Sequence, residues 1–289
     1  MSDFESRFWN HDGLKLHFRD YAGPAAGVPV LCLHGLTRNA RDFHDLACRL
    51  AAGRRVLVPD FRGRGRSEHA RDPLSYVPGC YLGDIRSLLA EQGIGRFGVI
   101  GTSMGGIVAM LLAAGGAPIA AAVLNDIGPV IEPAGLARIR GYVGRASSFP
   151  TWMHAARAVQ EANADIYPHW GLSDWLAMAK RSYRLTGAGR IVLDYDLKIA
   201  EPFRGQADAE APDMWAAFSA LGDVPTLIVR GARSDILSRA TAERMAASLP
   251  RADVLTVADV GHAPILSEPG VPEAIDRVLA MADGDRGDA

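Results

Sequence analysis

The amino-acid sequence predicts an α/β fold, in which a doubly wound, mostly parallel sheet carries an inserted helical segment. Short runs rich in Val, Leu and Ile recur along the chain with little polar alternation, which is typical of strands buried on both faces of a parallel sheet. Helical patterns lie between most of these runs, as right-handed β-α-β units require. This alternation stops between residues 130 and 221 and then resumes.

The predicted sheet begins with a hairpin, because two alternating segments flank the turn signal Asp12-Gly13. The buried strands that follow are PVLCLHG, RRVLVPD, RFGVIGTS, IAAAVLND, PTLIVRG and ADVLTVAD. The predicted helices between them are NARDFHDLACRLAA, YLGDIRSLLAEQG, MGGIVAMLLAAGG and SRATAERMAASLP. We therefore expect a core formed by residues 1–129 and 222–289, with residues 130–221 as a helical insertion. Within the insertion, Lys180, Arg181 and Arg184 are expected to form a solvated helix face.

The bulk composition excludes several classes of function. The chain has 289 residues and a formal net charge of -2, which gives no electrostatic footprint for nucleic acid or an anionic membrane. No apolar run is long enough to span a bilayer. The start, MSDFESRFWNHDG, has neither a basic nor an apolar signal region, so we expect no secretory signal. Cys32, Cys48 and Cys80 fit no disulfide or metal pattern, which favours free thiols and a cytoplasmic setting.

The stretch VIGTSMGGIV, residues 99–108, places three glycines around one serine between a predicted strand and a predicted helix. A phosphate-binding P-loop would need Gly-Lys-Ser/Thr, and a dinucleotide fingerprint would need G-x-G-x-x-G; neither is present. The run Gly63-Arg64-Gly65-Arg66-Ser67-Glu68 has two of the required glycines and fails at the third. GTSMG does fit G-x-S-x-G, a strained strand-to-helix corner that lifts a nucleophilic serine clear of the sheet. The nucleophile is therefore expected to be Ser103.

A serine nucleophile needs a histidine to take its proton and a carboxylate to orient that histidine. His262 is the candidate base, because it follows the last buried strand, at the sheet edge where ligands of doubly wound folds gather. Asp235, just after the strand PTLIVRG, is our first choice for the acid. Asp126, which ends the strand after the nucleophile helix, is a real competitor. Asp259 shares the loop of His262 and is expected to cap a turn.

The oxyanion of the tetrahedral intermediate needs fixed donors. One is expected to be the backbone N–H of Met104, which follows the nucleophile at the start of a helix. The second is expected to be the backbone N–H of Leu36, in the loop after PVLCLHG. His34 would then hold that loop and would not act as a base.

With Ser103, Asp235 and His262 in this order, the chain resembles the α/β-hydrolase superfamily over nearly its whole length. The resemblance rests on LCLHGLTRN, VPDFRGRGRS, GTSMGG, RGARSDIL and GHAPILSEP. It implies an α/β-hydrolase core at residues 1–129 and 222–289, and a cap at 130–221 that shapes substrate choice. It also implies that the D-x-R-G-x-G-x-S segment, from Asp60 to Ser67, is architectural.

The resemblance also narrows the chemistry. A serine nucleophile argues against the haloalkane dehalogenases and epoxide hydrolases, which use aspartate. We therefore expect a serine hydrolase that cleaves a carboxylic ester or lactone of a small to medium apolar substrate through an acyl-enzyme, with no cofactor and no metal ion. One alternative is a carbon–carbon bond hydrolase of a vinylogous diketone, although Ala263 follows His262 where those enzymes are expected to carry an aromatic residue. A ligand-binding, receptor-like member of the fold is another. The sequence does not predict the oligomeric state.

Overall fold

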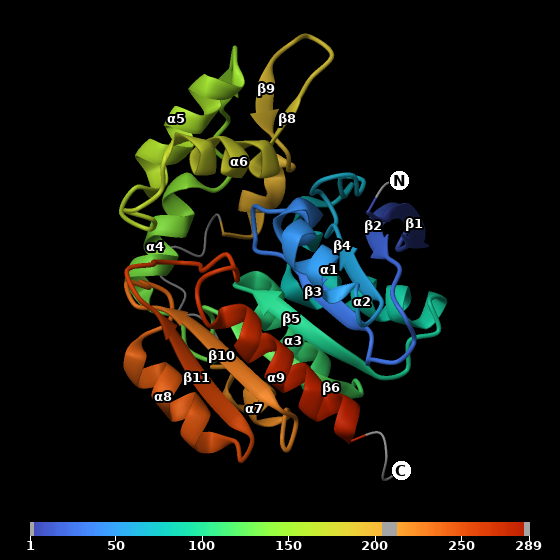
Figure 1. The fold of residues 1–289 in the computed structure, drawn as a ribbon. Coiled ribbons are helices and arrows are strands. Elements are labelled where there is room, and N and C mark those ends of the chain that lie inside the picture. Colours follow the sequence, from blue (N-terminus) through green and yellow to red (C-terminus); the bar gives the residue numbers. More distant parts are fainter. Residues whose placement is uncertain (1–2, 204–212, 286–289) are drawn as a thin grey trace.

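A central sheet of eight strands divides the chain into two layers of helices (Figure 1). The computed structural model describes residues 3–203 and 213–285. The strand order is β1-β2-β4-β3-β5-β6-β10-β11. The bounds are β1 Glu5–His11, β2 Leu14–Tyr21, β3 Val30–Leu33, β4 Val56–Pro59, β5 Phe97–Thr102, β6 Ile119–Asn125, β10 Thr226–Gly231 and β11 Ala252–Val257. Strand β2 is antiparallel to both of its neighbours, and all the other pairs are parallel, so the predicted fold class is confirmed.

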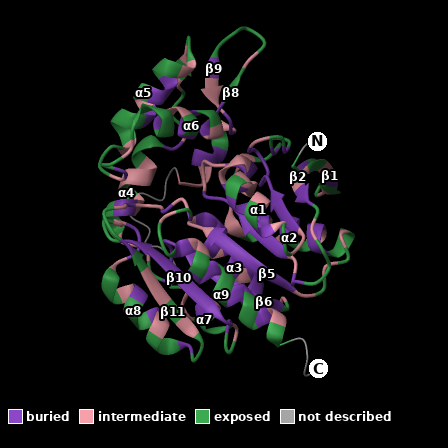
Figure 2. Ribbon diagram, in the orientation of Figure 1, coloured by how far each residue is buried: buried purple, intermediate pink, exposed green. Residues whose placement is uncertain are grey.

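Helices cover both faces of this sheet. Their bounds are α1 His44–Leu50, α2 Pro78–Glu91, α3 Met104–Ala114, α8 Arg239–Ser248 and α9 Val271–Gly284, with short 3-10 turns η1 Ala40–Phe43 and η2 Pro73–Ser75. Helices α1 and α9 pack on one face, and α2, α3 and α8 pack on the other. Successive side chains of β5 alternate between the two layers, since Val99 joins one hydrophobic cluster and Ile100 the other. The sheet interior is accordingly buried along its length (Figure 2).

The chain leaves the sheet after β6 and returns to it at β10. The elements between are α4 Pro133–Tyr142, β7 Ser148–Phe149, α5 Trp152–Asn163, α6 Leu172–Ser182, β8 Tyr183–Leu185, β9 Ile191–Leu193, η3 Leu197–Phe203 and α7 Trp215–Ser219. Helices α5 and α6 enclose a separate hydrophobic cluster around Trp175, above the carboxyl ends of the parallel strands (Figure 1). At the end of the segment, Phe218 of α7 packs with the main core instead.

The inserted segment contains a small antiparallel sheet, ordered β7-β9-β8, where only helices were predicted. Its strands have two or three residues each, which is too short for a period-two pattern to show in the sequence. No helix of the described ranges is long and apolar enough to cross a membrane.

The turn after β4 is braced by buried polar contacts. The Asp60 carboxylate lies 2.7 Å from His17 Nδ1 and accepts hydrogen bonds from the N–H groups of Ala40, at 2.6 Å, and Arg66, at 3.0 Å. A side chain at Gly65, whose φ is +54°, would collide with this carboxylate. Asp60 therefore ties the turn to β2 and to the loop before α1, an arrangement that agrees with the architectural role that the resemblance implies.

Candidate active site

Ser103 occupies a sharp corner between β5 and α3. Its φ and ψ are 52° and -118°, a region that non-glycine residues adopt at a cost of about 1–3 kcal/mol. The glycines around it permit close packing: a Cβ at Gly101 would lie 2.5 Å from the Gly105 carbonyl oxygen, and a Cβ at Gly105 would collide with the Leu33 carbonyl. The strand and the helix therefore approach each other closely enough to hold this corner, which presents the Ser103 hydroxyl at the carboxyl end of the sheet.

Three side chains from separate loops form a hydrogen-bonded chain at this corner. His262 Nε2 is 2.9 Å from Ser103 Oγ, and His262 Nδ1 is 2.8 Å from Asp126 Oδ2. Asp126 is fully buried, and the side chain of His262 is 10% exposed. The carboxylate selects the tautomer with hydrogen on Nδ1, so Nε2 has a free lone pair toward the serine.

The Asp126 carboxylate is held by the loop that follows β10. Its Oδ1 accepts the Gly231 N–H at 2.8 Å, and its Oδ2 accepts the Ser234 hydroxyl at 2.6 Å. Ser234 Oγ in turn accepts the N–H groups of Ile236 and Leu237, at 3.2 and 3.1 Å, so its proton is directed to the carboxylate. The buried charge is therefore fully hydrogen-bonded.

Asp235, our first choice for the acid, does not contact His262. Its carboxylate makes a two-pronged ion pair with Arg138 of α4, at 2.6 and 2.8 Å, and these hydrogen bonds lower its pKa. The loop RGARSD thus supplies two groups, Gly231 and Ser234, that hydrogen-bond to the Asp126 carboxylate, and it is Asp126 that contacts the histidine. Because β6 and β10 are neighbours, both aspartates follow strands that end beside each other, and the loop conformation decides which one turns inward. Asp259 lies in an exposed turn near Arg233 and His169.

Two residues that the sequence analysis did not single out brace the histidine loop. Asn125, which is buried, donates from Nδ2 to Thr102 Oγ1 at 3.0 Å and to the Pro264 carbonyl at 2.8 Å. It therefore links the strand end before Ser103 to the histidine loop. Tyr167, between α5 and α6, donates its hydroxyl proton to the Ala263 carbonyl and stacks on Trp170. The available sequence signal for Asn125 was an Asn at the end of a predicted buried strand, directly before Asp126. The contact of Tyr167 depends on how the inserted segment docks.

The two candidate oxyanion donors, Leu36 and Met104, belong to segments close to Ser103. Gly106 and Ile107 donate their N–H groups to the Ser103 carbonyl, at 2.8 and 3.2 Å, whereas Met104 comes before the first intrahelical bond of α3. Its N–H is one of those that a helix start leaves open. The Leu36 loop lies beside the serine, because a Cβ on Gly35 would be 3.8 Å from Ser103 Cβ. Both positions suit donors to an oxyanion.

The neighbouring histidine, His34, holds the Leu36 loop in place. Its Nε2 accepts the Phe61 N–H at 3.1 Å, so its Nδ1 carries the hydrogen and donates to the Gly35 carbonyl at 2.8 Å. The ring is completely buried, and burial lowers its pKa to about 4. His34 is therefore a neutral structural residue.

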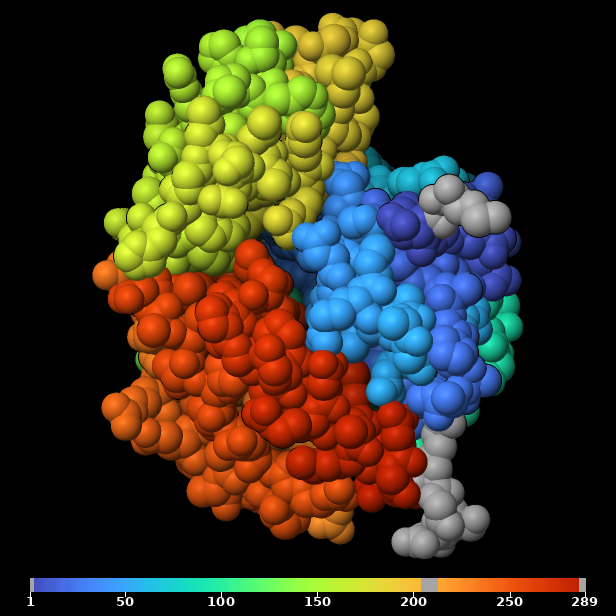
Figure 3. Space-filling model, in the orientation of Figure 1, coloured from blue at the N-terminus to red at the C-terminus, as the bar shows by residue number. Residues whose placement is uncertain are grey.

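A cavity of about 550 Å³ opens onto Ser103 and His262. Its walls come from the loop after β3, from the inserted segment and from the histidine loop, and Figure 3 shows the surface hollowed where these parts meet. The apolar part of the wall includes Leu36, Ile139, Val159, Leu193, Ile265 and Leu266. This size and lining suit a small organic ligand.

The polar part of the cavity wall is basic. Four arginines and one acidic residue line it: Arg38, Arg138, Arg145, Arg181 and Asp42. The expectation that Arg181 belongs to a solvated helix face is wrong, because this residue is half-buried against the cavity. Its backbone carbonyl is fixed by Asn39 Nδ2 at 2.8 Å and by the Arg41 guanidinium at 2.8 and 3.0 Å.

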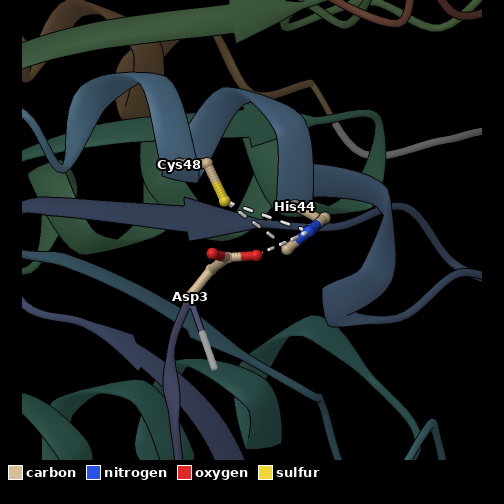
Figure 4. Close-up of side chains that lie close together, drawn as sticks. All are labelled: Asp3, His44 and Cys48. Carbon is tan, nitrogen blue, oxygen red and sulfur yellow. Dashed lines mark hydrogen bonds and ion pairs between the residues drawn. The ribbon is translucent and has the colours of Figure 1, made fainter. Parts of the chain in front are cut away.

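A second cluster lies at the start of α1, away from this cavity. Asp3, His44 and Cys48 point toward one another (Figure 4), with one ligand atom from each within 4.8 Å of the others. His44 Nε2 is 3.8 Å from Asp3 Oδ2 and 3.9 Å from Cys48 Sγ. Carboxylate, imidazole and thiolate are all ligands that Zn²⁺ accepts, so these residues could hold a metal ion. However, partial burial and the nearby Asp3 and Asp45 raise the pKa of the Cys48 thiol, which disfavours its thiolate form.

A serine at a strand-to-helix corner, hydrogen-bonded through a histidine to a buried aspartate at the carboxyl edge of a doubly wound sheet, is typical of the α/β-hydrolase class. Residues 30–273 match the model of the Alpha/beta hydrolase family, and the chain belongs to that family. It is 35% identical over 264 residues to the 3-hydroxybutyrate-oligomer hydrolase of Cupriavidus necator, covering 88% of this chain and 89% of that protein. It is 26% identical over 240 residues to the 2-(acetamidomethylene)succinate hydrolase of Mesorhizobium japonicum, covering 82% of each.

Among solved structures, the chain is similar to an alpha/beta hydrolase from Novosphingobium aromaticivorans. The two share 55% sequence identity and superpose with a TM-score of 0.93, over 97% of this chain and 99% of that one. The body and the inserted segment therefore both have counterparts in that structure.

Proposed function

We propose that the protein is a serine hydrolase of carboxylic esters, in which Ser103 is the nucleophile, His262 the base and Asp126 the acid. The observation that carries this proposal is the continuous chain from Asp126 Oδ2 through His262 to Ser103 Oγ, with separations of 2.8 and 2.9 Å. The name of the relative from Cupriavidus necator gives further support, since an oligomer of a hydroxy acid is joined by ester bonds.

The reaction proceeds in two halves. His262 Nε2 takes the proton of Ser103 as Oγ attacks the substrate carbonyl carbon, and the Asp126 carboxylate stabilises the imidazolium that forms. The Leu36 and Met104 N–H groups hold the oxyanion. When the tetrahedral intermediate collapses, the bond to the leaving alcohol breaks and the alcohol oxygen takes the proton from His262 Nε2.

The second half releases the acid. A water molecule gives a proton to His262 Nε2 and attacks the acyl carbon, and the new intermediate expels Ser103 Oγ, which regains the proton. Asp126 keeps its charge throughout. No cofactor takes part in either half.

Labelling with a fluorophosphonate, followed by peptide mapping, tests the nucleophile. We expect Ser103 to be modified, and Ser103→Ala to lose both labelling and ester hydrolysis. Ser219→Ala, which alters an exposed serine of α7, is the matched control and should keep both. Labelling elsewhere, or full activity in Ser103→Ala, would show that the mechanism is wrong.

A substrate panel tests the reaction class. It contains simple alkyl esters, lactones and a vinylogous diketone. We expect turnover of esters, with lactones accepted when the ring fits the cavity. Cleavage of the diketone at a carbon–carbon bond, with esters untouched, would replace ester hydrolysis as the proposed function.

A further inference from the structure

The cavity wall carries more positively charged than negatively charged side chains. The whole chain has a formal net charge of -2, yet the residues that line the cavity include four arginines against a single acidic residue. A buried or half-buried cation needs a counter-charge or hydrogen-bond acceptors. The hydrogen-bond and ion-pair partners of each arginine therefore show whether its charge is neutralised within the protein or is free to bind a ligand.

Two of the four arginines are neutralised within the protein. Arg38 clasps Asp42 with two hydrogen bonds of 2.6 Å and also donates to Ser182 Oγ at 2.6 Å. Arg138 is closed in the same way by Asp235, at 2.6 and 2.8 Å. Both oxygens of each carboxylate are thus already hydrogen-bonded to their own arginine.

The other two arginines have no such partner. Within residues 3–203 and 213–285, the guanidinium groups of Arg145 and Arg181 make no hydrogen bond or ion pair with another residue. The positive charge of Arg181 favours the ionised form of Asp42 through space. The hydrogen bonds to the two Asp42 oxygens, however, come from Arg38. The hydroxyl of Ser147, which also lines the cavity, is buried and has no hydrogen-bond partner among the described residues.

A short series of contacts joins Arg181 to the nucleophile. A Cβ on Gly35 would be 3.8 Å from Ser103 Cβ and 3.5 Å from Arg38 Cγ. Arg38 reaches Ser182, which follows Arg181 directly. The same cavity wall includes apolar side chains, which suit an aliphatic chain that connects the reacting carbonyl to a charged end.

We propose that the cavity selects esters whose acyl part ends in a free carboxylate, with Arg181 as the main anion-binding residue and Arg145 assisting it at the rim. A guanidinium offers parallel N–H donors that match the two oxygens of a carboxylate. This inference rests on the proposed ester hydrolysis and narrows the apolar substrate expected from the sequence: the chain is apolar and its far end is anionic.

Three ethyl esters of similar length provide the test: monoethyl adipate, which is anionic, ethyl 6-methylheptanoate, which is its neutral isostere, and ethyl 6-aminohexanoate, which is cationic. We expect kcat/KM to fall in that order. Arg181→Gln should lower kcat/KM for monoethyl adipate about tenfold, or about 1.4 kcal/mol, and leave the neutral ester within about twofold. Arg145→Gln should act in the same direction but more weakly.

Arg157→Gln is the matched control, because it removes the same charge from the exposed surface of α5, outside the cavity. It should preserve the preference among the three esters. Equal kcat/KM for the anionic and neutral esters in the wild type, or a preference unchanged by Arg181→Gln, would overturn the proposal while ester hydrolysis by Ser103 stands.

A binding measurement separates the two proposals if no ester is hydrolysed. Calorimetric titration of the Ser103→Ala variant with adipate should show binding, and adding Arg181→Gln should weaken it about tenfold. Stronger binding of inorganic phosphate than of adipate would assign the arginines to a different anion and reject the carboxylate. Absence of adipate binding would also reject it.

Discussion

Replacing Asp126 by asparagine tests the choice between the two candidate acids. Asp126 Oδ2 accepts the Nδ1 hydrogen of His262 at 2.8 Å from a fully buried position. An asparagine that turns its amide N–H₂ toward Nδ1 would favour the other tautomer, with hydrogen on Nε2. The histidine could then no longer accept the proton of Ser103.

The expected loss follows from these two effects. The imidazolium in the transition state loses a charge-assisted hydrogen bond, which contributes about 1.5–3 kcal/mol, and the wrong tautomer adds to this. Together they predict a fall in kcat of about 10³- to 10⁴-fold, or about 4–5.5 kcal/mol. An asparagine oxygen can still accept the Gly231 N–H that Oδ1 now accepts at 2.8 Å, so we expect the fold to persist.

The matched variant is Asp235→Asn. It breaks the pair with Arg138, but both side chains are about a third exposed, at 33% and 37%, so the stability change should be about 0–1 kcal/mol. Its kcat should stay within about threefold of the wild type, a change of less than 1 kcal/mol. Initial rates of ester hydrolysis, with circular dichroism to confirm folding, measure both variants. If Asp235→Asn lost as much activity as Asp126→Asn, or if Asp126→Asn kept a tenth of the activity, our assignment of the acid would be wrong.

Three further outcomes are expected. Ser234→Ala removes one donor to Asp126 and should lower kcat about 10-fold, through a less firmly held carboxylate, with KM little changed. Gly105→Ala should destabilise the fold by more than about 3 kcal/mol in urea unfolding, because its Cβ would collide with the backbone of Leu33. Acid should destabilise the protein through His34: its pKa is about 4 when folded and 6.5 ordinarily, so the unfolded state binds more protons between these values. The free energy of unfolding should therefore fall by about 3 kcal/mol from this residue as the pH drops from 6.5 to 4.

Control variants isolate each effect. Gly79→Ala also changes a helical glycine, but nothing lies within 4 Å of its added Cβ, so it should not destabilise the fold. His34→Gln should flatten the pH dependence of unfolding between pH 4 and 6.5, whereas His154→Gln, at an exposed position of α5, should not. An unchanged slope in His34→Gln would show that another group causes the acid sensitivity. A Ser234→Ala effect on KM alone would place that serine in substrate binding instead.

The fold and the nucleophile corner were predictable because they depend on local patterns. A buried strand, a glycine-rich turn and a helix in direct succession leave few conformations for Ser103, and the contacts of Gly101 and Gly105 show why small residues stand there. The position of His262 after the last strand was predictable for a similar reason. Parallel strands deliver their following loops to one edge of the sheet.

The aspartate that contacts His262 and the arginines that line the cavity could not be predicted in this way. Asp126 and Asp235 both follow strands that end at the same edge, and their sequence positions are equally compatible with reaching His262. The two aspartates differ in their partners. Asp235 forms an ion pair with Arg138 of α4, whereas Asp126 accepts hydrogen bonds from Gly231 and Ser234.

The sequence by itself therefore determined a doubly wound, mostly parallel sheet and the loops that carry the serine and the histidine. These features follow from the periodicity of hydrophobic residues and from short-range steric constraints. Only the tertiary structure decided which aspartate contacts the histidine. It also decided that Arg181 lines the cavity and does not lie on the solvated helix face that was expected for it. The first outcome depends on the loop after β10 and on the ion pair of Asp235 with Arg138 of the inserted segment, and the second depends on how that segment docks over the sheet edge. That docking sets long-range charge pairing, which no local pattern in the chain encodes.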